Sequence, residues 1–150
     1  MVSKNKHTQR SQCPIACGLD MVGDHWTLLI VRDLLLLGRH EFRDMLEGDE
    51  GISSNILSDR LSKLQQDGLV SSLPHPESKR RKLYYLTPKG KDLIHVLVAM
   101  ARWSLTHMPD QTLLPSQHLQ AIQSGQKGFI QQVLDNLAQW EQQYGIHQVT

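Results

Sequence analysis

The stretch that decides the fold is residues 51–68, which read Gly-Ile-Ser-Ser-Asn-Ile-Leu-Ser-Asp-Arg-Leu-Ser-Lys-Leu-Gln-Gln-Asp-Gly. Leucines recur in it at intervals of four and three residues, which places them on one face of a helix. These positions are Leu57, Leu61 and Leu64. Ser53 is a favourable N-cap, and Gly68 is a common residue just after a helix end. The stretch therefore predicts a helix from Ser53 to about Asp67 with one apolar face.

The opposite face of this helix is polar and typical of a helix that reads DNA. A recognition helix needs short hydrogen-bonding side chains so that its backbone can approach base edges in the major groove. The candidate recognition residues are Ser53, Ser54, Asn55, Ser58, Asp59, Ser62 and Lys63. The first two begin the helix, where free amide groups favour a phosphate. Any solvent-facing helix has polar residues, so this surface alone leaves a purely structural role open.

Three helices are predicted before it. Residues 25–37 are apolar on nearly all sides, so they should form the buried core helix. Residues 41–47 predict one or two helical turns, followed by a turn at 48–51. The short helix, the turn and the helix from Ser53 have the spacing of a helix-turn-helix. A further short helix should begin at Pro14.

A β-hairpin with a basic run follows. Residues 69–73 and 81–86 are predicted as strands, and a loop with two prolines separates them. A hairpin needs a helix to lie on, and after a helix-turn-helix it forms a winged helix. Its tip should carry four cations that can reach along the DNA backbone. They are Lys79, Arg80, Arg81 and Lys82. A solubilising turn is the alternative. Arg39 and Arg43 are further candidates for phosphate contacts.

The rest of the chain predicts more helices and a dimer. Thr87 starts a helix to about His107, and a last helical segment from Ser116 contains two glycines that can divide it. Both have apolar stripes wider than one small domain needs, so we expect a homodimer; a tail folded over its own core is the alternative. The predicted fold is mainly α with a small β-hairpin. Its parts are a flexible basic arm (1–12), a winged helix-turn-helix domain with a dimerisation helix (13–108), and a C-terminal helical extension that contributes to dimerisation (109–150).

Composition excludes several classes of protein. The 150 residues include 16 Lys and Arg against 15 Asp and Glu, and the net charge of +1 argues against a uniformly basic protein that coats nucleic acid. The longest apolar run, residues 26–37, is too short and too charged to span a bilayer. The first residues lack the apolar stretch of a secretory signal, and two cysteines cannot form a disulfide framework. We therefore expect a cytoplasmic protein with no membrane contact, no metal and no cofactor.

Cys13 and Cys17 are candidates for redox sensing. Cys13 precedes Pro14 at a helix start, where free backbone amides and the nearby Arg10 favour a thiolate. Cys17 would share its helical face. Buried thiols acting as small hydrophobes are the alternative, and a zinc site would need two more ligands. A redox enzyme using the pair would need a positioned base, for which no motif is visible.

We expect structural roles, and not functional ones, for Arg60 and three histidines. Arg60 lies between the polar and apolar faces of its helix, so we expect it to pair with a nearby acid rather than to read bases. Asp33 in the core helix is a candidate for a similar internal ion pair. The histidines His25, His40 and His75 are expected at surface or cap positions.

The ordered motifs resemble those of one family. They are Cys13-Pro14, residues 23–38 (Gly-Asp-His-Trp-Thr-Leu-Leu-Ile-Val-Arg-Asp-Leu-Leu-Leu-Leu-Gly), Phe42, residues 51–61, Gly68-Leu-Val and Tyr84-Tyr-Leu-Thr-Pro-Lys-Gly. From about Cys13 to Trp103 the chain resembles the HxlR-type winged-helix regulators of bacteria and archaea, which are MarR-like.

The resemblance implies a homodimeric transcription factor that binds a palindromic operator. It implies that Ser53, Ser54, Asn55 and Ser58 lie on the recognition helix and that residues 79–82 lie on the wing. Family members often carry a cysteine at the Cys13 position, and in several of them it senses quinones, aldehydes or oxidants. We therefore expect a DNA-binding regulator rather than an enzyme, with an electrophile or oxidant effector as a further hypothesis. The alternatives are a thiol-based redox protein and a winged-helix protein-interaction module.

Overall fold

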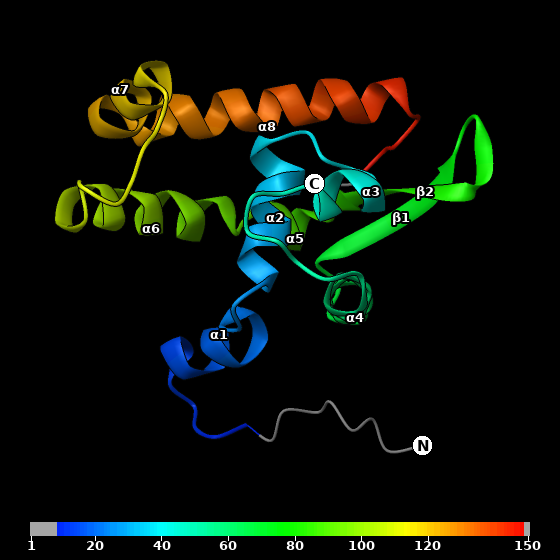
Figure 1. The fold of residues 1–150 in the computed structure, drawn as a ribbon, viewed down its shortest axis with the longest axis horizontal. Coiled ribbons are helices and arrows are strands. Elements are labelled where there is room, and N and C mark those ends of the chain that lie inside the picture. The colour runs from blue at the N-terminus through cyan, green and yellow to red at the C-terminus, as the bar shows by residue number, and fades with distance from the viewer. Residues whose placement is uncertain (1–8, 149–150) are drawn as a thin grey trace.

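The computed structural model describes residues 9–148, apart from the side chains of residues 117 and 124. In that range it is mainly helical, with one two-stranded antiparallel sheet. The elements in chain order are α1 (Pro14–Val22), α2 (Thr27–Leu36), α3 (Phe42–Leu46), α4 (Ser54–Gln66), β1 (Val70–His75), β2 (Ser78–Leu86), α5 (Pro88–Lys91), α6 (Ile94–His107), α7 (Ser116–Ser124) and α8 (Gln126–Gln143) (Figure 1). This order confirms the predicted fold class. None of the described helices is both long and apolar enough to cross a membrane.

The central helix of the core is α2, as its apolar sequence predicts. Its residues Val31 and Leu34 are fully buried, and the helix contacts β2, α6 and α8. It begins slightly later than predicted because Asp24 caps it: Oδ1 of Asp24 accepts hydrogen bonds from the amides of Trp26 (2.9 Å) and Thr27 (3.0 Å). The capping carboxylate satisfies two amides that a helix start would otherwise leave open.

Helix α4 forms as its sequence predicts. The Ser53 hydroxyl accepts a hydrogen bond from the amide of Ile56 (3.2 Å), which confirms the N-cap. The three leucines of its apolar face, Leu57, Leu61 and Leu64, are all buried. Gly68 follows the helix with φ +74°, a conformation that favours glycine. These local signals fix where the polar face of α4 begins and ends.

The hairpin is longer than predicted, and this corrects the position of its basic run. Both strands extend through the segment expected as a loop, so the turn is at Pro76 and Glu77. Pro74 pairs with Lys82 in the ladder, next to a bulge. A two-stranded sheet tolerates this proline because each strand has an edge where no donor is needed. The four cations therefore lie in the first half of β2, beginning two residues after the turn, instead of partly in a loop.

The helix predicted from Thr87 to His107 is two helices. The Thr87 hydroxyl accepts from the amide of Gly90 (3.2 Å), which confirms the cap. Gly90 lies so close to the start of the hairpin that an added Cβ would be 2.1 Å from the carbonyl oxygen of Leu69. Close packing thus requires glycine here, and glycine is a weak helix former. A turn at residues 92–93 separates α5 from α6.

The C-terminal extension folds against its own chain. Gly125 divides it into α7 and α8, whereas Gly128 lies inside α8. Helix α8 contacts α2 and α6, and its residues Val133 and Leu137 are buried in the same hydrophobic cluster as the centre of α2. Figure 1 shows α8 running beside α6 across the top of α2. One core therefore serves both the helix-turn-helix and the extension, while a dimerisation role for the extension stays a prediction.

Helix α1 contacts this core only at its end, where Met21 and Val22 pack against it. It has no buried residue, and the relative exposures of Ile15 and Leu19 are 74% and 57%. Figure 1 shows α1 below the rest of the molecule. Of the basic arm predicted for residues 1–12, the first eight residues lie outside the described range. In the remainder, Arg10 pairs with Asp20 of α1, with 2.6 Å between Nη2 and Oδ1.

Candidate nucleic-acid interface

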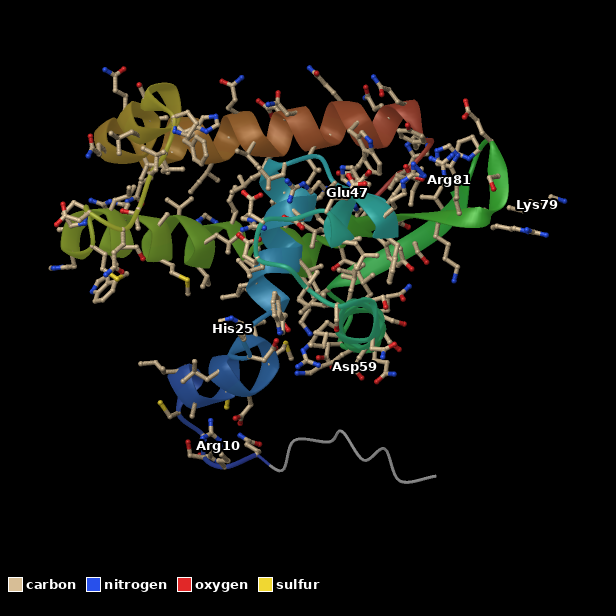
Figure 2. All side chains as sticks on the ribbon, viewed as in Figure 1. Arg10, His25, Glu47, Asp59, Lys79 and Arg81 are labelled. Atoms are coloured by element: carbon tan, nitrogen blue, oxygen red, sulfur yellow. The ribbon has the colours of Figure 1, made fainter. Side chains whose placement is uncertain are left out.

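The outer face of α4 is polar and open. Every predicted recognition residue on it except Lys63 is exposed: Ser53, Ser54, Asn55, Ser58, Asp59 and Ser62. Figure 2 shows Asp59 on the side of α4 that faces away from the rest of the molecule. Lys63 is half-buried and its Nζ donates to the carbonyl oxygen of Met21 at 3.4 Å. The structure therefore brings six of the seven candidates together on one surface and turns the seventh toward the end of α1.

Arg60 anchors this helix, as its position between the two faces predicts. Its Nε lies 3.0 Å from Oδ1 of Asp24, and its Nη1 lies 2.5 Å from Oδ2 of Asp59. Burial by itself would raise the pKa of Asp24, but hydrogen bonds from Thr27, Trp26 and Arg60 outweigh burial and hold the pKa well below its usual value. Asp24 thus stays charged and ties the start of α2 to α4.

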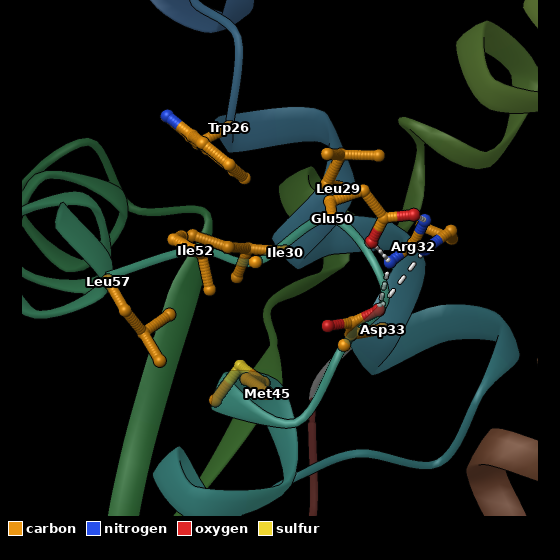
Figure 3. A pocket seen from close by; sticks show the side chains of 11 residues that line it. Trp26, Leu29, Ile30, Arg32, Asp33, Met45, Glu50, Ile52 and Leu57 are labelled. Carbon is orange, nitrogen blue, oxygen red and sulfur yellow. Dashed lines mark hydrogen bonds and ion pairs between the residues drawn. The ribbon is translucent and has the colours of Figure 1, made fainter. Parts of the chain in front are cut away.

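A second ion network holds the turn that precedes α4. Arg32 on α2 binds Glu50 in the turn with two hydrogen bonds of 2.9 and 2.8 Å, and it also donates to Asp33 (Figure 3). Burial is the largest influence on Asp33 and raises its pKa, although Arg32 and Arg39 oppose that effect. The hollow beside this network holds no more than about one water molecule. The prediction of an internal ion pair for Asp33 is confirmed, and Arg32 is a partner that sequence reasoning missed.

The candidate phosphate contacts Arg39 and Arg43 differ in their surroundings. Nη1 of Arg39 faces Asp33 at 3.5 Å, and the side chain is only 30% exposed. Arg43 on α3 is exposed and has no ion pair in the described part of the chain. Of these two arginines, only Arg43 has a guanidinium group that is not directed at an acid within the described residues.

The four cations of the wing also differ in whether an acid of the same chain pairs with them. The register of the hairpin shifts between the pairs His75–Ser78 and Pro74–Lys82, so Lys79, Arg80 and Arg81 lie in a bulge of β2. Arg81 pairs with Glu41, with 2.6 Å between Nη2 and Oε1. The other three are exposed and have no ion pair within residues 9–148. Figure 2 shows Lys79 pointing outward and Arg81 on the α3 side of the hairpin.

The two cysteines are free thiols at the start of α1. Cys13 is the N-cap residue and is exposed, and its side chain makes no capping hydrogen bond. Cys17 is half-buried; its Sγ donates to the carbonyl oxygen of Ser11 at 3.5 Å and accepts from Gln9 at 3.8 Å. Among the described residues, no group of three or more His, Cys, Asp or Glu could hold a metal ion.

His40 corrects the expectation that the histidines lie at the surface. It is 4% exposed, its ring stacks on Trp140 at 3.6 Å between centroids, and its Nδ1 lies 2.9 Å from the carbonyl oxygen of Tyr84. Burial lowers the pKa of His40, although the Tyr84 carbonyl, Asp44 and Glu141 oppose this. No local signal reveals this site, because its partners are distant in sequence.

A helix-turn-helix with an open polar helix and a following basic hairpin defines a winged-helix DNA-binding protein. The chain belongs to the HxlR-like helix-turn-helix family, whose model matches residues 21–112. Proteins of this family are transcriptional regulators and not enzymes.

Individual relatives agree with this assignment. The HTH-type transcriptional regulator Rv3095 of Mycobacterium tuberculosis is 35% identical over 91 residues, which cover 61% of this chain and 56% of the relative. The chain thus matches little more than half the length of that relative. Among solved structures, the transcription factor PA1607 has a TM-score of 0.62 at 35% identity, covering 71% of this chain and 74% of that chain. The reduced form of the transcriptional regulator YodB from B. subtilis has a TM-score of 0.53 at 28% identity, covering 68% of this chain and all of that chain.

Proposed function

We propose that this transcriptional regulator binds a palindromic operator as a homodimer, with α4 in the major groove of each half-site and the wing beside the DNA backbone. The observation that carries the proposal is the exposed polar face of α4, which is anchored from behind by buried leucines and by the Arg60–Asp24 ion pair. Short side chains on a fixed helix let the backbone approach base edges closely enough for direct hydrogen bonds. A DNA target also implies a cytoplasmic location.

The proposed contacts follow from chemistry and exposure. Asn55, Ser58 and Ser62 can donate to or accept from base edges, and Asp59 can accept from the amino group of cytosine. Ser53 and Ser54 lie at the N-terminus of α4, where amides and the helix dipole favour a phosphate. The exposed wing cations and Arg43 supply phosphate contacts that carry no sequence information. Arg39, Arg81 and Lys63 are assigned a smaller role, because each is already directed at an oxygen atom of the chain.

The proposed dimer surface consists of α1 and α6. On α6 the exposed apolar residues Val96, Met100 and Trp103 recur at intervals of four and three residues, so they form one stripe, and Trp103 is 60% exposed. On α1 the exposed residues are Ile15 and Leu19. Apolar stripes of this kind usually pack on a partner. A two-fold axis between two copies would place two α4 helices about 34 Å apart, one turn of DNA.

We further propose that oxidants or electrophiles modulate DNA binding through Cys13 and Cys17. Cys13 is exposed at the start of α1, where an oxidant or electrophile can reach its thiol. Because α1 also carries part of the proposed dimer surface, a modified Cys13 would alter that surface directly. A thiol-based redox protein remains the alternative function, and turnover of a thiol substrate without any DNA binding would favour it. A protein-interaction module is the other alternative and requires no duplex binding.

Selection from a pool of randomised duplexes tests the proposed operator. The full chain should enrich a two-fold symmetric site, and Asn55→Ala should change the preferred bases at matching positions of both half-sites. Gln66→Ala, at the far end of α4, is the matched control and should leave the preference unchanged. An enriched site without symmetry would contradict the dimer, and an unchanged preference in Asn55→Ala would contradict its role in reading bases.

A separate experiment tests the thiol hypothesis. Diamide or a quinone should weaken binding of the wild-type chain to the enriched duplex, and Cys13→Ser should abolish this response while keeping the basal affinity. If the response survives in Cys13→Ser, then Cys13 is not the sensor.

A further inference from the structure

The open edge of the wing is covered by residues that lie far from it in sequence. In a two-stranded sheet, the side of β2 that faces away from β1 presents N–H and C=O groups that the ladder leaves unpaired. The amide of Tyr84 donates to the carbonyl oxygen of His40 at 2.8 Å, and the carbonyl of Tyr84 lies 2.9 Å from His40 Nδ1. Two residues further on, the carbonyl of Leu86 accepts a hydrogen bond from Gln148 Nε2 at 2.8 Å.

The C-terminal extension supplies one of these hydrogen bonds and also a ring contact to His40. Its residue Trp140 stacks on the His40 ring with an interplanar angle of 13°. Gln148 reaches the Leu86 carbonyl while its Nε2 also lies 2.7 Å from Oε2 of Glu141. Figure 1 shows the segment after α8 turning back from the end of that helix toward the base of the hairpin. The extension therefore contacts the base of the wing directly through Gln148 and indirectly through His40.

A buried ion pair joins α8 of the extension to α5. Glu141 is 5% exposed, and its Oε1 lies 2.5 Å from Nζ of Lys91 on α5. A buried carboxylate is costly unless it is paired and hydrogen-bonded, and here each oxygen has a partner. Glu141 thus orients Gln148 on one side and holds α5, which follows the wing, on the other.

These contacts lie on the same strand as the wing cations and can therefore set the direction of that strand. Lys82 precedes Leu86 by four residues, which is about 13 Å along an extended strand. A strand held at its base by hydrogen bonds has a defined direction, whereas an isolated two-stranded hairpin is only marginally stable. The family model ends at residue 112, so the contacts made by residues 140–148 belong to a segment beyond it.

We propose that Trp140, Glu141 and Gln148 are positioning residues for DNA binding, which hold the open edge of β2 and thereby set the direction in which the wing presents its cations to the DNA backbone. The proposal rests on the wing role given under Proposed function. It assigns the C-terminal extension a task in DNA binding that requires no contact between the extension and the DNA.

A double-mutant cycle between the extension and the wing tests this proposal. The probe is a fluorescein-labelled mixed-sequence duplex of about 30 base pairs, long enough for two half-sites one turn apart. Affinity is measured by fluorescence anisotropy at several salt concentrations for four full-length proteins: wild type, Gln148→Ala, the wing variant K79A/R80A/K82A, and their combination. Gln142→Ala, an exposed glutamine of α8, is the matched control. Circular dichroism melting shows that every variant is folded at the assay temperature.

Gln148→Ala should weaken binding by about threefold or more and flatten the salt dependence, because fewer wing cations reach phosphates. In the wing-variant background the same substitution should have almost no effect. General destabilisation would instead act equally in both backgrounds, so the cycle separates the two causes. Glu141→Gln should behave as Gln148→Ala does, and Gln142→Ala as wild type.

Two results would overturn the proposal. If Gln148→Ala and Glu141→Gln bind the duplex as wild type does, or if their loss persists in full without the wing cations, the extension does not act through the wing, while the proposed wing role stands. If the wing variant itself binds as tightly as wild type, the wing role fails and the positioning role fails with it.

Discussion

Arg60 on α4 reaches back to Asp24, which precedes α2, with 3.0 Å between Nε and Oδ1. Asp24 meanwhile caps α2 through the amides of Trp26 and Thr27 and accepts from the Thr27 hydroxyl. One carboxylate therefore starts the core helix and fixes the helix that is proposed to enter the major groove. This link joins residues 36 positions apart.

The Asp24–Arg60 pair should stabilise the fold measurably. A double-mutant cycle with Asp24→Asn and Arg60→Ala in urea unfolding should give a coupling energy of about 1 kcal/mol, because both side chains are about three-quarters buried. Asp59 offers the matched control, since it contacts the same arginine but is 66% exposed. Its coupling to Arg60 should be smaller, and equal couplings would contradict the structural distinction.

Asp24 should also contribute to acid sensitivity. Its pKa in the folded protein is held below the ordinary value of 3.8, so the unfolded chain takes up a proton first as the pH falls. The stability that Asp24 contributes is therefore fully present above about pH 4 and is lost as the pH falls below it. Thermal melting between pH 5 and pH 2 should show a shallower decline for Asp24→Asn than for wild type; parallel declines would argue against the lowered pKa.

The wing cations should not contribute equally to DNA binding. Lys79→Ala, Arg80→Ala and Lys82→Ala should each weaken binding to all sequences and reduce the slope of log K against log salt by about one. Arg81→Ala should reduce the slope less, because Glu41 already accepts from Arg81. Salt titrations by fluorescence anisotropy measure both quantities. A loss of slope in Arg81→Ala as large as in Arg80→Ala would show that the Glu41 pair opens on DNA.

His40 should make the fold less stable in mild acid. Burial lowers its pKa below 6.5, so below that pH the unfolded chain binds a proton that the folded protein resists. Stability should therefore decline as the pH falls from about 7 to 5, and His40→Gln should reduce that slope in denaturant unfolding. The groups that face His40 and oppose this effect are the Tyr84 carbonyl, Asp44 and Glu141. His95→Gln, which removes an exposed histidine from α6, is the control; an unchanged slope in His40→Gln would contradict the prediction.

Much of the fold follows from local signals. Ser53 and Thr87 act as N-caps, Gly68 follows the end of α4 and Gly125 divides the extension, all as their sequence positions predict. The strand ends follow less well from local signals, because the prolines of β1 favour a loop in sequence although the hairpin accommodates them in a strand. The basic run therefore lies in the first half of β2, after a shorter turn than the sequence predicts.

In the candidate site, too, some features follow from the local sequence and others depend on tertiary packing. The polar face of α4 follows from helical periodicity, because the residues that bury one face also expose the other. The state of each cation does not follow from periodicity. Arg39 faces Asp33 and Arg81 faces Glu41, yet neighbouring Arg43 and Arg80 are open. Which acid meets which cation depends on how elements pack.

By itself, the sequence determined the order of elements, the caps, the apolar and polar faces of α4, and the family, because these properties depend on residues within a few turns of one another. Tertiary structure alone decided that α8 packs over α2, that His40 is buried beneath Trp140, and that Gln148 covers the edge of the wing. Gln148 and Leu86 are 62 positions apart in the sequence, and His40 and Trp140 are 100 positions apart. No local pattern encodes such pairs, because each depends on where the whole core places its surface.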